Sequence, residues 1–178
     1  MFLDLDCELC RLCHERTKVV APSGDLASPV VFVGEAPGEK EDLSGKPFVG
    51  RAGRMLDRLL EEEGLPRDSI MITNTVKCRP PGNRRPKADE VLACRLYLED
   101  DLRGKQLIVC MGRTACEGLL NNQVVMRDCA NQTFTIALGR ERIDLVPTYH
   151  PSAALRNLEA REGLRRTIRL VKERFPEL

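Results

Sequence analysis

Aromatic side chains are scarce in this chain of 178 residues, which has no tryptophan, two tyrosines and five phenylalanines. A surface that stacks many bases in a row needs more aromatic residues than this, so the composition leaves room only for recognition of a single base. No apolar stretch approaches the roughly 20 residues that a bilayer requires. The N-terminal segment carries acidic residues and cysteines where a secretion signal has a basic patch and an apolar run. We therefore expect a cytoplasmic protein with no membrane partner.

A net charge of either sign is also missing. The 28 basic and 27 acidic side chains leave a formal charge of +1, so overall electrostatics does not favour nucleic acid as a partner, and a DNA-binding surface has to be local. Hydrophobic residues make up 42% of the chain, which is enough for a real core at this length. We expect one domain over residues 1–178 and a monomer.

Short apolar runs alternate with helical patterns along the chain. The run at 29–34 ends at a glycine and is typical of a strand buried on both faces of a parallel sheet. The expected strands are 29–34, 69–74 and 106–110, followed by 134–136 and 142–146 paired around Gly139. The expected helices are 51–63, 86–102, 113–120 and 158–175. This alternation predicts an α/β fold of three layers, α/β/α, with a mainly parallel central sheet of about four strands.

Polar side chains follow the ends of the expected strands. In sheets of this kind ligands lie beyond the carboxyl ends of the strands, which is where Glu35, Asn74 and His150 fall. An asparagine amide offers a donor and an acceptor and is suited to reading a pyrimidine edge, and a histidine can change its charge near physiological pH. Each has an ordinary alternative: an acidic loop residue, a turn or cap asparagine, and a histidine packed in a loop.

Two glycine-rich loops accompany these residues. The first, Gly34-Glu35-Ala36-Pro37-Gly38, directly follows a strand, so its backbone can approach a ligand closely, and Glu41 adds a carboxylate. The second places Phe48 between glycines, where stacking on a planar ligand is more natural than a role in the core.

Eight cysteines are unusual for a chain with no export signal, because disulfides seldom persist in a reducing compartment. Cys7 and Cys10 form a CxxC pair, and Cys78 and Cys94 stand far downstream, so four thiolates can converge on a metal. Zinc and a cubane iron-sulfur cluster both accept four cysteines, and the spacing does not separate them. Cys13 extends the pair to CxxCxxC and competes with Cys7. The remaining three are expected to be small buried apolar residues: Cys110, Cys116 and Cys129.

Basic residues cluster in two places. The loop 79–87 contains Arg84 and Arg85, and the segment 156–169 contains five arginines that begin with Arg156. Phosphate contacts would explain both clusters. For the last four arginines the favoured alternative is a solvated helix face, because glutamates interleave with them.

Several motifs occur together, and they do so in a specific order. They are Gly34-Glu35-Ala36-Pro37-Gly38 with Glu41-Asp42, then Pro47-Phe48-Val49-Gly50, then Asn74 to Pro81, then His150 to Arg156. Their order and separations resemble the family 4 uracil-DNA glycosylases, and the resemblance runs from Cys7 to Arg156. It implies a uracil-DNA glycosylase-like fold and an enzyme that hydrolyses the N-glycosidic bond of flipped-out deoxyuridine in single- or double-stranded DNA. The product is an abasic site, which initiates base excision repair.

The resemblance also implies a cofactor and a role for each site residue. A 4Fe-4S cluster is held by Cys7, Cys10, Cys78 and Cys94, with Cys13 as a bystander. Phe48 stacks on the uracil, Asn74 reads its edge, and His150 donates to a carbonyl oxygen of the departing base. The backbone around Gly34, Ala36, Pro37 and Gly38 assists. The DNA contacts are assigned to Arg84, Arg85, Ser152, Leu155 and Arg156. Of these, Leu155 and Arg156 form the wedge that fills the space left in the base stack by the flipped nucleotide.

Activation of the water is the step for which the motifs leave a choice. Ala36 stands where better-known uracil glycosylases carry an aspartate, so another group must orient the water. Glu35 is the first candidate and Glu41 the second, with Glu41 alternatively shaping the pocket against the methyl group of thymine. A related branch traps its product through a histidine in the loop after the asparagine motif; the loop 79–87 has none, which favours a turnover enzyme.

Two other classes of protein stay open. In a zinc-stabilised nucleic-acid-binding domain the cysteines would be structural, but the polar residues would have no role. An iron-sulfur electron-transfer protein would release no uracil.

Overall fold

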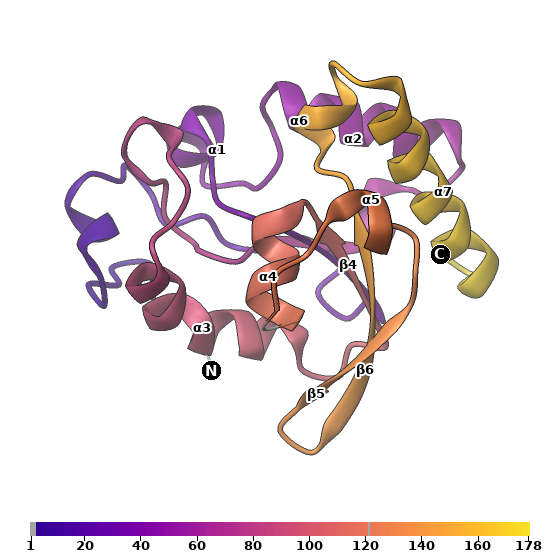
Figure 1. The fold of residues 1–178 in the computed structure, drawn as a ribbon. Coiled ribbons are helices and arrows are strands. Elements are labelled where there is room, and N and C mark those ends of the chain that lie inside the picture. Colours follow the sequence, from indigo (N-terminus) through magenta and orange to yellow (C-terminus); the bar gives the residue numbers. More distant parts are fainter. Residues whose placement is uncertain (1–2, 121) are drawn as a thin grey trace.

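The strands form one sheet between two layers of helices (Figure 1). The computed structural model describes residues 3–120 and 122–178, and these residues form a six-stranded sheet in the order β1-β3-β2-β4-β6-β5. The four central strands are mutually parallel, and both edge strands pair antiparallel to their neighbours. The predicted α/β fold with a mainly parallel sheet is confirmed, and the sheet has six strands where about four were expected. The strands are β1 Ser23–Gly24, β2 Val30–Gly34, β3 Met71–Asn74, β4 Leu107–Met111, β5 Phe134–Leu138 and β6 Glu141–Thr148.

The long helices lie where the leucine spacing predicts them. The α-helices are α1 Glu39–Ser44, α2 Arg51–Glu62, α3 Ala88–Leu102, α4 Arg113–Leu120, α5 Met126–Cys129, α6 Pro151–Ala154 and α7 Leu158–Arg174; 3-10 turns are η1 Arg11–His14, η2 Arg67–Ser69 and η3 Pro81–Asn83. Helix α3 begins two residues after Pro86, because the carboxylate of Glu90 accepts the backbone N–H of Lys87 at 2.8 Å and fixes the first turn there. The sequence pattern does not predict α1, α5, α6 or β1, which are too short to show a hydrophobic period.

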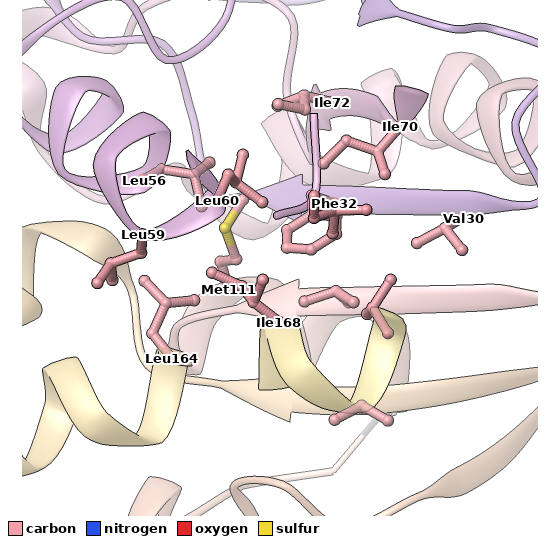
Figure 2. Close-up of a cluster of buried hydrophobic side chains, with 14 of the residues drawn as sticks. Val30, Phe32, Leu56, Leu59, Leu60, Ile70, Ile72, Met111, Leu164 and Ile168 are labelled. Carbon is pink, nitrogen blue, oxygen red and sulfur yellow. The ribbon is translucent and has the colours of Figure 1, made fainter. Parts of the chain in front are cut away.

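The two faces of the sheet bury separate cores. Alternate residues of β2 point to opposite faces, so Phe32 packs among side chains of α2 and α7, whereas Val31 packs against α3 and α4. Figure 2 shows the first core, in which Leu56 of α2 and Ile168 of α7 lie close to Phe32. Each such side chain, fully buried, contributes about 1.5–3 kcal/mol of transfer free energy. These cores hold the carboxyl ends of the strands in fixed positions.

A third apolar cluster joins the N-terminal segment to the loop after β3 and to α3. It contains Leu12, Val76, Cys78 and Cys94. The carboxylate of Asp42 in α1 is 2% exposed and accepts the backbone N–H of Thr17 at 2.9 Å, so the segment is also tied to α1. The N-terminal cysteines are therefore fixed against the same strand end that carries Asn74.

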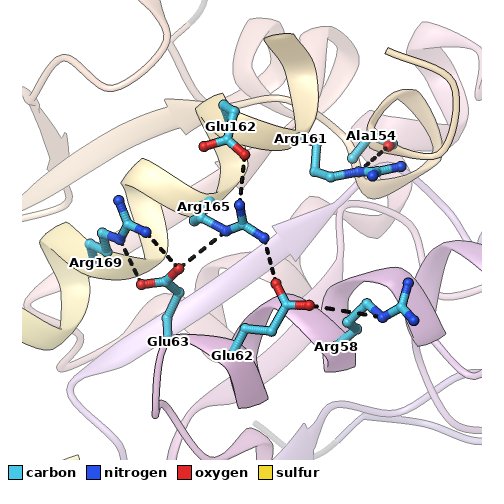
Figure 3. Close-up of polar contacts among 8 residues, drawn as sticks. All are labelled: Arg58, Glu62, Glu63, Ala154, Arg161, Glu162, Arg165 and Arg169. Atoms are coloured by element: carbon cyan, nitrogen blue, oxygen red, sulfur yellow. Dashed lines mark hydrogen bonds and ion pairs between the residues drawn. The ribbon is translucent and has the colours of Figure 1, made fainter. Parts of the chain in front are cut away.

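The C-terminal arginines pair with carboxylates at the seam between α2 and α7 (Figure 3). Arg165 contacts Glu62 at 2.5 Å and Glu162 at 2.6 Å, and Arg169 contacts Glu63 at 2.6 Å. This arrangement agrees with the interpretation of these two arginines as part of a charged helix face. Within the described residues, no helix combines the length and the apolar character needed to cross a membrane.

Candidate active site

A pocket of about 350 Å³ opens beyond the carboxyl ends of β2 and β3. It is lined by Glu35, Ala36, Pro37, Gly38, Glu41, Phe48, Ala52, Asn74, Pro80, Asn83, Arg84, His150 and Ser152. Ten of the site residues expected from the sequence thus meet in one place, although they come from five separate segments. Gly34 lies directly behind the pocket, and Arg85, Leu155 and Arg156 lie outside its lining. The sequence did not predict Ala52 or Asn83 as site residues, and it included Pro80 only as part of the motif Asn74 to Pro81.

Asn74 ends β3 and faces the pocket with its amide buried. The side chain is 3% exposed, and among the described residues its Oδ1 is the one buried side-chain nitrogen or oxygen without a hydrogen-bond partner. Leaving a buried acceptor unpaired costs about 1–3 kcal/mol, so the free protein maintains this atom at a cost in stability. A ligand that donates an N–H at this position would remove that cost.

Gly34 allows Asn74 and Phe48 to approach each other behind the strand end. It pairs with Asn74 in the parallel ladder of β2 and β3. A Cβ atom at Gly34 would lie 2.4 Å from the ring of Phe48 and 2.5 Å from Oδ1 of Asn74, both far inside van der Waals contact. Only glycine therefore fits here.

Phe48 forms one wall of the pocket in a strained backbone conformation. Its φ is +53°, a value that a bulky residue seldom adopts, and its side chain is 6% exposed. The ring centroid lies 5.7 Å from that of His150, at an interplanar angle of 37°. The two rings form an angled corner that suits a planar ligand.

His150 precedes α6, and a local hydrogen bond fixes its tautomer. The backbone N–H of Ser152 donates to Nδ1 at 3.1 Å, so the proton of the neutral ring is on Nε2. Burial lowers the pKa of His150 to about 4, and the charge of Glu41 opposes this shift only weakly. At neutral pH the residue is an uncharged N–H donor.

Glu41 binds the backbone of the two glycine-rich loops. Its Oε2 accepts the N–H of Gly38 at 3.2 Å, and its Oε1 accepts those of Val49 at 2.9 Å and Gly50 at 2.7 Å. The carboxylate therefore joins the start of α1 to the loop that carries Phe48. Glu35 lines the same pocket, and within the described part of the chain its carboxylate accepts no hydrogen bond from the protein.

Comparison with known proteins identifies, over nearly the whole chain, the family that the sequence motifs resemble. Residues 21–174 match the family model of the uracil DNA glycosylase superfamily. A protein of Saccharolobus solfataricus named type-4 uracil-DNA glycosylase is 40% identical over 174 residues, which cover 94% of this chain and 81% of the relative. This chain is a type-4 member of the uracil-DNA glycosylase superfamily. The resemblance inferred from the motifs is thereby confirmed.

Two further relatives carry the same name. One, from Thermotoga maritima, is 42% identical over 153 residues, which cover 85% of this chain and 79% of the relative. The other, from Sulfurisphaera tokodaii, is 38% identical over 176 residues, covering 95% and 80%.

Lys77 holds the end of β3 in this glycosylase; the sequence analysis included it in the motif Asn74 to Pro81 but gave it no role. The side chain is 1% exposed; its Nζ donates to the carbonyl oxygen of Asn74 at 2.8 Å and pairs with Asp101 at 2.5 Å. Its backbone N–H donates to Sγ of Cys94 at 3.3 Å. One residue thus connects the pocket to the cysteines. A lysine between two apolar residues just after a buried strand was the available signal.

Two arginines of the loop after β3, Arg84 and Arg85, are both paired with carboxylates in the glycosylase. Arg84 lines the pocket and donates to the two carboxylate oxygens of Glu90 at 2.8 and 2.6 Å. This pair lowers the pKa of Glu90 to about 2, since the hydrogen bond and the charge of Arg84 favour the carboxylate. Arg85 pairs with Glu117 of α4. Each of these two guanidinium groups therefore already has a carboxylate partner.

Five cysteines line a second, narrow pocket between the N-terminal segment and α3. They are Cys7, Cys10, Cys13, Cys78 and Cys94. Arg16 and Lys77 also line this pocket, and the remaining lining side chains are apolar or Tyr97. Within residues 3–120 and 122–178, no three histidine, cysteine, aspartate or glutamate side chains are placed to hold one metal ion. The other three cysteines are buried, as the sequence predicted: Cys110, Cys116 and Cys129.

The thiols of this pocket influence one another unequally. Burial raises the pKa of Cys78 to about 12; Arg16 opposes the shift, and the thiols of Cys94, Cys10 and Cys7 add to it. Cys13 is not among these thiols, and its Sγ lies 3.6 Å from Nδ1 of His14. Cys13 nevertheless lines the same pocket, and it adds with Cys7 to the raised pKa of Cys10.

Proposed function

We propose that this glycosylase hydrolyses the N-glycosidic bond of a deoxyuridine flipped into the pocket, leaving an abasic site in DNA. It would act as a cytoplasmic monomer that initiates base excision repair. The observation that carries the proposal is the unpaired Oδ1 of Asn74, an acceptor buried where the N3–H of uracil would donate. The Nδ2 of the same amide is then available to the adjacent carbonyl oxygen of the base.

The same amide accounts for discrimination against cytosine. Cytosine presents an acceptor at N3 and a donor at the exocyclic amine, so both of its edge groups would meet groups of the same kind on Asn74. Buried polar groups left unpaired in this way support discrimination of several orders of magnitude. Phe48 would stack on the face of the base, and the backbone of residues 34–38 would contact its other edge.

His150 supplies stabilisation of the leaving group. Cleavage passes through an oxocarbenium-like sugar while uracil departs as an anion, so a donor is needed at the oxygen where negative charge develops. The Nε2–H of a neutral imidazole meets this need without proton transfer. Because the rings of His150 and Phe48 meet at an angle, a base stacked on Phe48 would lie beside this donor.

Glu35 is the group that we assign to positioning the water. Glu41 is committed to three backbone N–H donors, whereas Glu35 lines the pocket at the end of β2. We therefore give Glu41 the role of a positioning residue that holds the loops of the pocket together. A carboxylate free to accept a hydrogen bond from water is what the hydrolytic step requires.

The DNA backbone would cross the mouth of the pocket near α6. Ser152 lines the pocket and is exposed, as is Arg156, and we assign both to DNA contacts. Leu155 is half-buried against the first core, so only part of it is available to fill the vacated stack. Arg84 and Arg85 would contribute charge from the other rim while keeping their carboxylate partners.

A 4Fe-4S cluster bound by Cys7, Cys10, Cys78 and Cys94 is the cofactor that the donor set fits. Zn–S bonds of about 2.3 Å draw four thiolates close together, and thiols too spread for one ion fit the larger cubane better. Arg16 and Lys77 at the pocket would offset the negative charge of a thiolate cluster. Such a cluster would supply structural support, since it would cross-link the N-terminal segment to the loop that follows Asn74.

Cys94→Ser and Cys13→Ser should behave differently if this ligand set is correct. Protein with Cys13→Ser should keep its visible absorption, its iron content and a melting temperature close to that of the wild type. Cys94→Ser should lose iron and unfold at a lower temperature. Loss of iron from Cys13→Ser, with Cys7→Ser retaining it, would show that Cys13 is the fourth ligand. An equimolar content of zinc with no visible absorption would exclude the cluster.

Uracil excision itself is tested with a labelled oligonucleotide that contains one uracil. We expect alkali-labile strand breaks at the uracil in single-stranded DNA and opposite guanine, and none in a cytosine or thymine control. A mispaired or single-stranded base costs less to flip, because less stacking and pairing is lost. Absence of cleavage by cluster-loaded protein on both substrates would leave the alternatives of a DNA-binding domain or an electron-transfer protein.

A further inference from the structure

Helix α2 carries an exposed row of arginines beside the active site. Arg51, Arg54 and Arg58 are separated by three and four residues, so they lie on one face of the helix, and all three are exposed. Together with Met55 and Leu155 they line a groove of about 340 Å³ between α2 and α6. The three positions span about 10 Å of helix at 1.5 Å per residue.

The charge of this row is largely unneutralised. Among the described residues, neither Arg51 nor Arg54 has a carboxylate within salt-bridge distance, and the carboxylate nearest to Arg58 is that of Glu62, at 3.9 Å. The arginines of α7 differ, since Arg165 and Arg169 are bound by the glutamates at the end of α2 (Figure 3). The basic groove is therefore open to an anionic partner.

The position of these charges in the helix is also unfavourable without such a partner. Arg51 is the first residue of α2, and this first turn has no acidic side chain, although the positive end of a helix dipole disfavours cations. The first turns of α1 and α3 both contain acidic residues. A bound anion would offset the repulsion at the start of α2.

The basic groove adjoins the pocket along helix α2. Ala52 lines the uracil pocket, and its neighbours Arg51 and Arg54 line the groove. Leu155, at the other side of the groove, follows the short helix that His150 caps. A strand whose base enters the pocket would pass directly over this surface.

We propose that Arg51 and Arg54, with Arg58 at the far end, bind consecutive phosphates of the DNA strand that carries the flipped uracil. Three consecutive phosphates span two steps of about 3.4 Å along the DNA axis, about 7 Å, which long arginine side chains from a row of about 10 Å can cover. This proposal depends on the proposed glycosylase activity, because it places the strand by the position of its uracil. The row fixes the register of the strand, and the exposed part of Leu155 is available to contact the bases.

The test compares Arg51→Ala/Arg54→Ala with Arg140→Ala/Arg142→Ala. The control removes the same charge from the exposed end of the β5–β6 hairpin, which extends away from α2 and α6 (Figure 1). Binding is measured by fluorescence anisotropy between 50 and 200 mM salt, with a duplex that carries one 2′-fluorodeoxyuridine, an analogue that resists hydrolysis. Alanine is a good helix former, so neither helix α2 nor its packing should suffer.

We expect Arg51→Ala/Arg54→Ala to raise Kd about tenfold or more at 100 mM salt. The slope of log K against log salt should fall by about 1.8, since each lost phosphate contact on duplex DNA contributes about 0.9. The KM for uracil excision should rise with kcat changed less than about twofold, because these arginines bind phosphates and not the base. The control should change the slope by less than half as much.

Equal slopes and equal Kd values for the two double variants would overturn the proposal. This is also the result expected if the row binds an acidic protein and not DNA. This result differs from a failure of the glycosylase assignment, in which the wild-type protein itself releases no uracil from any oligonucleotide.

Discussion

Asn74→Ala should lower kcat/KM for uracil excision by about 10³-fold, because it removes both hydrogen bonds to the base edge in a buried site. The fold should survive. Lys77 donates to the backbone carbonyl of Asn74, which alanine retains, and the change removes the unpaired Oδ1. We expect the melting temperature to stay equal or rise while single-turnover excision is nearly abolished.

Asn74→Asp separates hydrogen bonding from packing. The aspartate has almost the same shape but offers no N–H donor when ionised, so uracil excision should fall about as far as in the alanine variant. Asn122→Ala is a matched control, since Asn122 is exposed and does not line the pocket; it should retain the wild-type rate. Retention of more than about a tenth of the activity by Asn74→Asp would mean that Asn74 does not read the base.

His150→Ala should lower kcat by about 10²–10³-fold with a smaller change in KM, since the donor acts mainly on the charge that develops as uracil leaves. His14→Ala provides the control, because His14 is the other histidine and is exposed. The measurement is single-turnover excision at saturating DNA. A large rise in KM with kcat unchanged would assign His150 to ground-state binding.

The pH dependence distinguishes a neutral donor from an imidazolium. With the pKa of His150 lowered to about 4, the ring is neutral throughout the range from pH 6 to 8, so His150 should add no titration to kcat there. If the protonated ring were the active form, kcat would fall steadily as the pH rises above its pKa.

The lowered pKa of His150 also makes the stability of the fold depend on pH. The ring in the unfolded chain, with a pKa near 6.5, binds more protons below that pH than the ring in the folded protein. The contribution of His150 to stability is therefore lost as the pH falls from about 6.5 towards 4, and His150→Gln should reduce that loss.

The order of the layers could be predicted because local patterns encode it. The continuous apolar run of β2 predicts a strand covered on both faces, and the leucine spacing of α2 predicts a helix that covers one of them. The short elements could not be predicted, because β1 is two residues long and forms only through its pairing with β3. The carboxylate-rich stretch after Gly38 forms helix α1. As a result Glu41 binds the loop that carries Phe48, whereas Asp42 binds the N-terminal segment.

The candidate site was predictable to the extent that its residues follow strand ends. Parallel strands bring their carboxyl ends to one edge, so Glu35, Asn74 and His150 meet without further information. Hydrogen-bond partners did not follow from this rule. The triple acceptance by Glu41 and the pairing of Arg84 with Glu90 join residues whose geometry depends on packing.

The sequence by itself determined the family, the fold class and the chemistry available at the strand ends, because motif order, hydrophobic period and residue type are local properties. Only the tertiary structure decided which groups are left without partners: the Oδ1 of Asn74 and the arginines at the start of α2. It also brought Cys13 into the pocket that Cys7, Cys10, Cys78 and Cys94 line. Whether a polar group is satisfied depends on the distances to atoms from distant parts of the chain, and those distances exist only once the sheet and its helices have packed.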